Sequence, residues 1–228
     1  MTLLHIETST NVCSVAMSLD GKCLFSKTDN KGQNHATLLS PFIQQALDYA
    51  KEQKLDLDAI SVSSGPGSYT GLRIGVSTAK GLCYGYKKPL IAVSTLETLC
   101  VEALKKHSIS ANALLCPMID ARRMEVYTAV YETNLNNVHE VHAKIIDNTS
   151  FAELLEKNQI YFFGNGADKC KEVLNHPHAI FLDDIEPLAE NMIPLAEKQF
   201  EINHFADVAY FEPFYLKEFQ ATTPKSVQ

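Results

Sequence analysis

The chain has 228 residues, of which 46% are hydrophobic and 21% charged, so it can form one large or two small domains with an ordinary globular core. Its formal net charge is −7 and only three residues are arginine, which disfavours a protein that holds nucleic acid through clustered cations. The N-terminus lacks the basic flank of a signal peptide, and no apolar run is long enough for a membrane span, so we expect a soluble, cytoplasmic protein with no membrane partner.

The first half of the chain reads as a strand-rich opening followed by alternating helices and strands. The pair Asp20-Gly21 is a strong hairpin signal between two of the opening strands. The last predicted helix of this half begins with Ser94 and has Glu97 three residues later, which is the pattern of a capping box. We predict strands over 3–8, 12–19, 22–28, 59–63 and 89–93, and helices over 35–51, from about 69, and over 94–106.

The second half begins again with strands and then alternates. We predict strands over 113–119, 125–131, 138–146 and 160–163, and helices over 150–157, from 167, and over 186–201. Because strands alternate with helices after an opening hairpin in each half, the pattern indicates an α/β protein with two related lobes. We place the lobes at 1–103 and 104–228, and the last segment is a candidate for packing back on the first lobe.

The segment 63–71, Ser-Ser-Gly-Pro-Gly-Ser-Tyr-Thr-Gly, begins like a phosphate-binding turn. It is not a P-loop, because Leu72 and Arg73 stand where that motif needs Lys and Ser or Thr. The Gly-x-Gly-x-x-x-Gly spacing also differs from that of a dinucleotide loop. Two interpretations remain: a turn whose amides and helix N-terminus hold an anion, and a strand-to-helix turn without a ligand.

Small residues recur at every fourth position of the helix that follows, at Gly71, Gly75 and Ala79. Each interior glycine costs about 1 kcal/mol of helix stability relative to alanine, so a close contact should compensate for it. The helix either packs tightly on its own sheet or presses against a partner helix. A second stripe of small residues comprises Ser77, Gly81 and Gly85.

The residues by themselves indicate no catalytic centre. There is no Gly-x-Ser-x-Gly nucleophile elbow, and the acidic residues form no clear acid–base pair. Six scattered cysteines without a Cys-x-x-Cys pair are typical of buried, reduced thiols and not of a zinc site or a disulfide framework.

Four segments together carry a resemblance to a known family. They are Ile6-Glu-Thr-Ser9, the glycine-rich turn over 65–75, Ile119-Asp-Ala-Arg-Arg-Met-Glu-Val-Tyr127 and Glu212-Pro-Phe-Tyr-Leu-Lys217. They resemble the TsaB family, the accessory subunits of bacterial tRNA threonylcarbamoyladenosine synthesis, over nearly the whole chain. The resemblance implies a two-lobed, actin-like or Hsp70-like ATPase fold of the sugar-kinase superfamily. It also implies a non-catalytic partner for TsaD, which transfers threonylcarbamoyl to the adenosine adjacent to the anticodon in tRNA.

The resemblance further implies how the chain assembles. Two helices pair with the same helices of TsaD in a four-helix bundle, the chain forms a homodimer when alone, and TsaE and tRNA are reached through the complex. The implied interface residues are Leu38, Phe42, Gly71, Ile74, Gly75, Thr78, Ala79 and Leu82. The candidate anion or nucleotide turn comprises Glu7, Thr8, Ser9, Gly65, Gly67 and Ser68.

The chain departs from TsaD at the metal-binding positions. The two histidines by which TsaD ligates its metal align with Thr95 and Leu99, and leucine cannot ligate a metal. We therefore expect no catalytic residue, metal or cofactor. The family's terminal Tyr-Leu-Arg ends here in Lys217, which removes a bidentate arginine. The alternatives are a metal-dependent transferase or protease and a small-molecule kinase of the same superfamily, although the opening loop lacks the Asp-Gly-Thr of such kinases.

Overall fold

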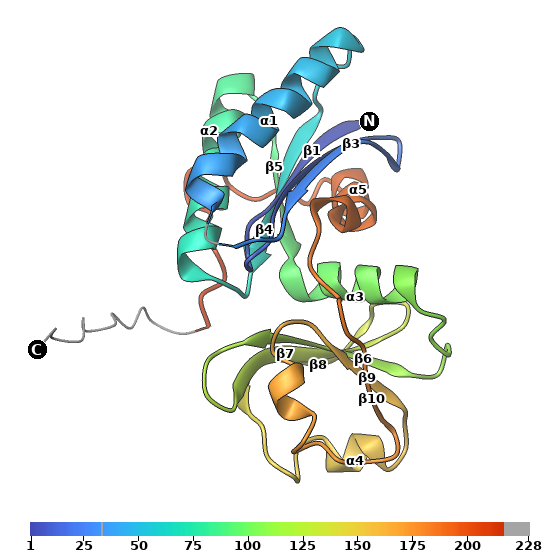
Figure 1. The fold of residues 1–228 in the computed structure, drawn as a ribbon. Coiled ribbons are helices and arrows are strands. Elements are labelled where there is room, and N and C mark those ends of the chain that lie inside the picture. Colours follow the sequence, from blue (N-terminus) through green and yellow to red (C-terminus); the bar gives the residue numbers. More distant parts are fainter. Residues whose placement is uncertain (33, 217–228) are drawn as a thin grey trace, which may run out of the picture.

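The computed structural model describes residues 1–32 and 34–216, and within them two lobes are each built on a five-stranded mixed sheet (Figure 1). The first sheet has the order β3-β2-β1-β4-β5. Strand β1 lies at its centre, antiparallel to β2 and parallel to β4, and every residue of β1 is buried. The strands are β1 (Thr2–Glu7), β2 (Cys13–Leu19), β3 (Lys22–Asp29), β4 (Ala59–Gly65) and β5 (Leu90–Ser94).

The second sheet repeats the topology of the first. Its order is β10-β9-β6-β7-β8, so β6 is central, antiparallel to β7 and parallel to β9, as β1 is to β2 and β4. The two halves of the chain therefore fold alike, as their matching strand patterns predict. The strands are β6 (Leu114–Asp120), β7 (Glu125–Glu132), β8 (Asn137–Ile145), β9 (Ile160–Phe163) and β10 (Ala179–Phe181).

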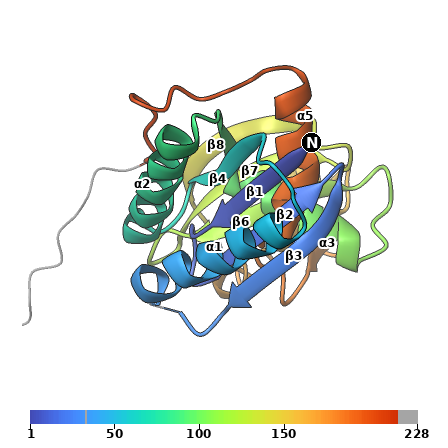
Figure 2. The ribbon, with the colours of Figure 1, turned by 90° about the horizontal axis from the view of Figure 1, so that it is seen from above.

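Helices cover both faces of the first sheet. Helices α1 (His35–Glu52) and α2 (Tyr69–Tyr86) lie beside one another on one face, and their buried sides join the core formed with β1, β2 and β4 (Figure 2). The opposite face is covered by the short 3-10 helix η2 (Ala189–Met192) and by α5 (Ile193–Glu201), both from the end of the chain. None of the helices in the described residues is long and apolar enough to cross a membrane.

Helix α3 (Thr95–Lys106) lies between the lobes and packs on the second sheet (Figure 1). Its N-terminus is capped as the sequence predicts, because the Ser94 hydroxyl accepts a hydrogen bond from the Glu97 amide. Residue 103, where we place the lobe boundary, lies inside this helix, and that division stays a prediction.

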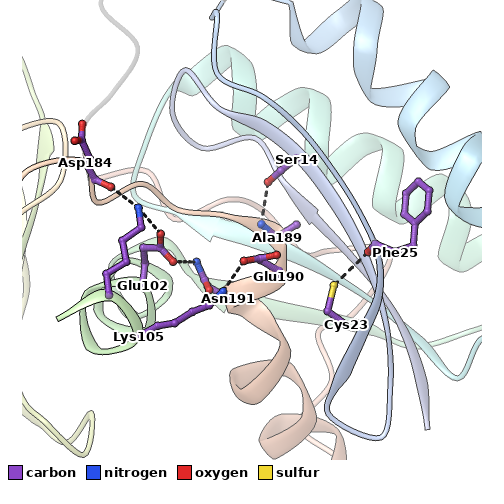
Figure 3. A network of polar contacts seen from close by, with 10 residues as sticks. Ser14, Cys23, Phe25, Glu102, Lys105, Asp184, Ala189, Glu190 and Asn191 are labelled. Carbon is purple, nitrogen blue, oxygen red and sulfur yellow. Dashed lines mark hydrogen bonds and ion pairs between the residues drawn. The ribbon is translucent and has the colours of Figure 1, made fainter. Parts of the chain in front are cut away.

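A buried polar network joins α3 to η2 and to the first sheet (Figure 3). The Asn191 side-chain amide donates to the Glu102 carboxylate over 2.7 Å, and the other oxygen of Glu102 pairs with Lys106 at 2.8 Å. The amide of Ala189 donates to the Ser14 hydroxyl on β2 over 2.8 Å. Glu102 and Asn191 are each only 2% exposed, so these bonds fix α3 against η2 inside the protein.

Three helices predicted in the second half are wrong in extent. The structure has only α4 (Ala152–Leu155) within 150–157, and a 3-10 turn, η1 (Asp168–Cys170), after 167. The helix predicted over 186–201 starts late, because Pro187 disfavours helical backbone at Glu186 and Pro194 lacks the amide hydrogen needed inside a helix. Pro194 accordingly stands in the first turn of α5. The short strand β10 was not predicted.

Candidate functional site

A cleft of about 870 Å³ lies between the two lobes. The first lobe contributes the loop after β1 (residues 9–11) and the turn before α2 (residues 66–70), and the second contributes the β6–β7 turn (residues 119–123). Residues 214–216, which follow α5, complete the wall. The lining is mainly polar and comes from segments far apart in the sequence.

The loop after β1 forms the floor of the cleft. Glu7 is fully buried at the end of β1, and its carboxylate accepts a hydrogen bond from the Ser9 amide. Burial away from water raises the pKa of Glu7 to about 7. The hydroxyls of Ser9 and Ser63 lie close enough to the carboxylate to oppose this rise, and the second carboxylate oxygen of Glu7 is buried without a geometrically formed hydrogen bond in the described protein. Such an oxygen is costly unless something pairs with it.

The turn before α2 lies directly against this loop. The Ser68 amide donates to the Ser9 carbonyl over 2.6 Å, and the Ser68 hydroxyl caps α2 by accepting from Gly71. A side chain at Gly67 would start 2.2 Å from the Ser9 carbonyl oxygen, so only glycine allows this approach. The sequence order of the two segments gives no hint that they touch.

The structure divides the six residues of the candidate anion turn. Ser9, Gly67 and Ser68 line the cleft. Thr8 lies behind the loop, where its hydroxyl donates to the Gly71 carbonyl, and Glu7 lies beneath Ser9. Gly65 lines a smaller hollow beneath the segment 211–215. The half of the candidate turn that faces the cleft is therefore Ser9, Gly67 and Ser68.

The opposite wall carries two adjacent arginines, which the sequence did not single out as site residues. Arg122 and Arg123 stand on the β6–β7 turn with positive φ angles of 69° and 49°. Asp120 stabilises the turn by accepting a hydrogen bond from the Arg122 amide, and Lys169 pairs with the same carboxylate. The only sequence signal was their place in the family-like segment 119–127.

The segment after α5 closes one side of the cleft with aromatic rings. The Phe214 amide donates to the Ser64 carbonyl over 2.7 Å, which attaches the segment to the end of β4. The ring of Tyr215 packs on that of Tyr69, with 4.9 Å between the centroids. Phe214 is 49% exposed. Lys217, at which the family's terminal arginine is replaced, lies outside the described residues.

The glycine stripe of α2 faces inward, which corrects the predicted interface. A side chain on Gly71 would start 2.1 Å from the Thr8 carbonyl oxygen, and one on Gly75 would start 2.2 Å from the Thr8 hydroxyl. Ala79 is fully buried in the core of the first lobe. Gly71, Gly75 and Ala79 therefore let α2 pack against its own loop and sheet. The sequence offered both interpretations, and the one within the chain is right.

The second small stripe lies on the outer face of α2. A Cβ added at Gly81 or at Gly85 would meet no atom within 4 Å, and Tyr84 between them is 85% exposed. The other residues of the predicted interface border this face, and each is partly buried. They are Leu38 and Phe42 on α1 and Ile74, Thr78 and Leu82 on α2.

Comparison with known proteins places the chain in a family. It matches the family model described as TsaD, tRNA N6-adenosine threonylcarbamoyltransferase, over residues 28–224. It is 30% identical over 225 residues to the tRNA threonylcarbamoyladenosine biosynthesis protein TsaB of Escherichia coli, covering 95% of each chain. This chain belongs to the TsaB family. The resemblance seen in the sequence is thereby confirmed.

Structural comparison agrees with this family. A crystal structure of a Pseudomonas aeruginosa protein, described as uncharacterized with similarity to peptidase YEAZ, matches with a TM-score of 0.81 and 26% identity. The match covers 95% of this TsaB-family chain and 99% of the other. The α/β fold class predicted from the sequence is confirmed, and both lobes are built on five-stranded mixed sheets; the actin-like assignment stays a prediction. Similarity also extends to the tRNA N6-adenosine threonylcarbamoyltransferase of Phytoplasma australiense, 28% identical over 131 residues, covering 50% of this chain and 40% of that protein.

Thr95 and Leu99, which the resemblance matched to the TsaD histidines, lie in the interior of this TsaB-family chain. Thr95 is fully buried at the start of α3, and Leu99 packs in the core between α3 and the second sheet. Within residues 1–32 and 34–216, no group of three or more His, Cys, Asp or Glu side chains is arranged to hold a metal ion. All six cysteines are free, and all except Cys23 are buried.

Proposed function

We propose that this chain is a non-catalytic partner subunit that TsaD requires for threonylcarbamoyl transfer to the adenosine adjacent to the anticodon in tRNA. Membership of the TsaB family assigns the chain to tRNA threonylcarbamoyladenosine biosynthesis. The finer role is our inference: the chain pairs with TsaD through α1 and α2, forms a homodimer when alone, and meets TsaE and tRNA through the complex.

The main support for the proposal is the outer face of α2. Two interior glycines, Gly81 and Gly85, face open space, where glycine gains nothing within the chain and costs the helix stability relative to alanine. Between them Tyr84 exposes most of its ring to water. Small residues next to an exposed aromatic side chain suit a second helix that approaches closely and covers the ring. Leu38 and Phe42 extend the apolar surface onto α1.

The interior of α3 supports a role without catalysis. Metal-assisted group transfer needs a cation held by several ligands beside the substrate. At Thr95 and Leu99 the helix presents a hydroxyl and a hydrocarbon, and both side chains are buried away from the cleft lining. The TsaD partner would then supply the metal and the transfer chemistry.

The test is to purify the chain together with TsaD from the same host and to compare Gly81→Leu with the wild type. A Cβ added at Gly81 has no atom of the described chain within 4 Å, so we expect the variant to fold normally. Bulk at a close helix–helix contact typically costs about 1–3 kcal/mol, which is roughly a 5- to 150-fold weaker association.

Ala152→Leu is the matched control, because Ala152 is an exposed alanine on α4 in the other lobe. We expect the Gly81 variant to elute without TsaD at low micromolar concentration and the control to elute with it. If the Gly81 variant elutes as a heterodimer with TsaD, as the wild type does, then α2 does not form the interface.

A further inference from the structure

Two of the three arginines of the chain line the interlobe cleft, and the third packs on a tyrosine ring of the lining. Arg122 and Arg123 line it from the second lobe. Arg73 stands on α2 with its guanidinium 5.0 Å from the centre of the Tyr69 ring, which also lines the cleft. In a chain with a net charge of −7, this is a local concentration of the residue that best recognises phosphate.

The guanidinium groups of Arg122 and Arg123 are available to a ligand. In residues 1–32 and 34–216 the ion pairs are made by lysines and by the N-terminal amine, and none involves an arginine. Arg122 and Arg123 are both exposed. The cleft lining adds Ser9, which is fully buried beside the Glu7 carboxylate.

Aromatic rings stand beside the arginines. Tyr69 and Tyr215 pack together at one side of the cleft, and Phe214 next to them leaves half of its surface exposed. Rings of this kind stack with nucleobases, and a stacked base adjacent to free cations is the usual arrangement for binding single-stranded nucleic acid.

The lining does not suit a metal-bound nucleoside triphosphate. No lysine is among the described residues that line the cleft, whereas such sites use a lysine for the terminal phosphates. The cations stand at the mouth, where single phosphodiester groups of a strand can reach them.

We propose that the mouth of the interlobe cleft binds a short single-stranded stretch of RNA, with phosphodiester groups on Arg122 and Arg123 and a base against Phe214. The inference rests on the proposed function, in which the complex acts on tRNA. Each phosphate neutralised on a single strand contributes about −0.7 to the slope of log K against log salt concentration, so three arginines alone give weak, salt-sensitive binding. Within the complex, the partner would hold the tRNA near the cleft and raise its effective concentration there.

The test compares the wild type with Arg122→Asn/Arg123→Asn in the complex with TsaD. Asparagine tolerates the positive φ angles of both positions, so the turn should keep its shape. The two residues lie on the β6–β7 turn of the second lobe and not on the outer face of α2, so pairing with TsaD should survive. The matched control, Lys27→Ala/Lys157→Ala, removes two exposed positive charges elsewhere.

Binding of labelled tRNA is measured over a range of salt concentrations. We expect the double variant to bind about tenfold more weakly at low salt and to lose about 1.4 from the salt slope, as two phosphate contacts predict. Phe214→Ala should weaken binding about fivefold or more and leave the slope unchanged, because stacking is not a charge interaction. The lysine control should match the wild type.

Three outcomes separate the hypotheses. Unchanged affinity and slope in the arginine variant, with an intact complex, would contradict the RNA site and leave the proposed function standing. If the arginine variant loses binding of ATP but binds tRNA normally, the cleft is a nucleotide site. This result would also contradict the RNA site. If the wild type does not pair with TsaD, the proposed function fails. The RNA site is then tested on the isolated chain with a labelled single-stranded RNA heptamer at low salt. Binding of the heptamer would support the site, and no binding would contradict it.

Discussion

The hydroxyl of Thr8 occupies the position from which a side chain on Gly75 would grow: a Cβ there would start 2.2 Å from Thr8 Oγ1. The contact joins the loop after β1 to the inner face of α2, and Thr8 also donates to the Gly71 carbonyl. The glycine therefore serves the fold and not a partner. Substitution of Gly75 should therefore lower the stability of the isolated chain.

We expect Gly75→Ala to lower the free energy of unfolding by about 1–3 kcal/mol, the usual range for overpacking. Thr8→Ala removes the hydroxyl and one methyl group, so the cost of Gly75→Ala should shrink in that background. Denaturant unfolding of the two single variants and the double variant measures this coupling. Additive effects would mean that the two residues do not meet.

Gly81→Ala should instead raise the free energy of unfolding. No atom lies within 4 Å of the new methyl group, and alanine is favoured over glycine inside a helix by about 1 kcal/mol. We expect the midpoint of denaturant unfolding to rise in this variant. Measurements at two protein concentrations separate this effect from any change in self-association. A midpoint below that of the wild type would show that Gly81 has an intramolecular contact.

The two glycine stripes show what sequence could and could not predict. Helical spacing correctly gave the start of α2 and its two faces with small residues, but spacing alone does not say which face meets the sheet. Only the fold brings Thr8 against Gly71 and Gly75, across more than sixty residues of chain. Hairpin signals such as Asp20-Gly21, and the repeated strand pattern, predicted both sheets because these signals are local.

The cleft was only half predicted for the same reason. The turn at Gly67 and Ser68 has a recognisable local pattern, and both residues line the cleft. Arg122 and Arg123 have no such pattern and reach the cleft only because the second lobe folds opposite the first. The helices of the second half are shorter than predicted, and in the last of them Pro187 and Pro194 delay the start of α5.

Glu7→Gln should change the pH dependence of stability. The pKa of Glu7 is raised by burial from 4.5 to about 7, so between these values the folded chain keeps a proton that the unfolded chain loses. The free energy of unfolding contributed by Glu7 therefore falls as pH rises from 4.5 to 7. The neutral variant lacks this fall and should be more stable than the wild type above pH 7, by an amount on the order of 3 kcal/mol.

The stability of the wild type must be subtracted from that of Glu7→Gln at each pH, because His5 makes stability change with pH in the opposite direction. Burial lowers its pKa from 6.5 to about 3, so its contribution to stability rises with pH between those values. Both proteins keep His5, and its effect cancels in the difference between wild type and Glu7→Gln. Denaturant unfolding from pH 4 to pH 8 gives this difference. A constant difference across the range would show that Glu7 titrates normally.

Asn191→Ala should destabilise the join between α3 and η2 (Figure 3). The variant leaves one oxygen of the buried Glu102 carboxylate without its donor, which typically costs about 1–3 kcal/mol. Lys105→Ala is the control: its ion pair with Glu190 is exposed, with 56% of the Lys105 side chain in solvent, and should be worth at most about 1 kcal/mol. Thermal unfolding that ranks the two variants the other way would contradict the network.

The most direct test of the partner-subunit role is to measure threonylcarbamoyladenosine in tRNA after reaction with threonylcarbamoyl adenylate. Three samples are compared by mass spectrometry of the digested tRNA: this chain alone, TsaD alone, and both together. We predict modification by the pair, much less by TsaD alone, and none by this chain, which should also carry no stoichiometric metal. Modification by this chain alone, with one equivalent of metal bound, would contradict the non-catalytic role.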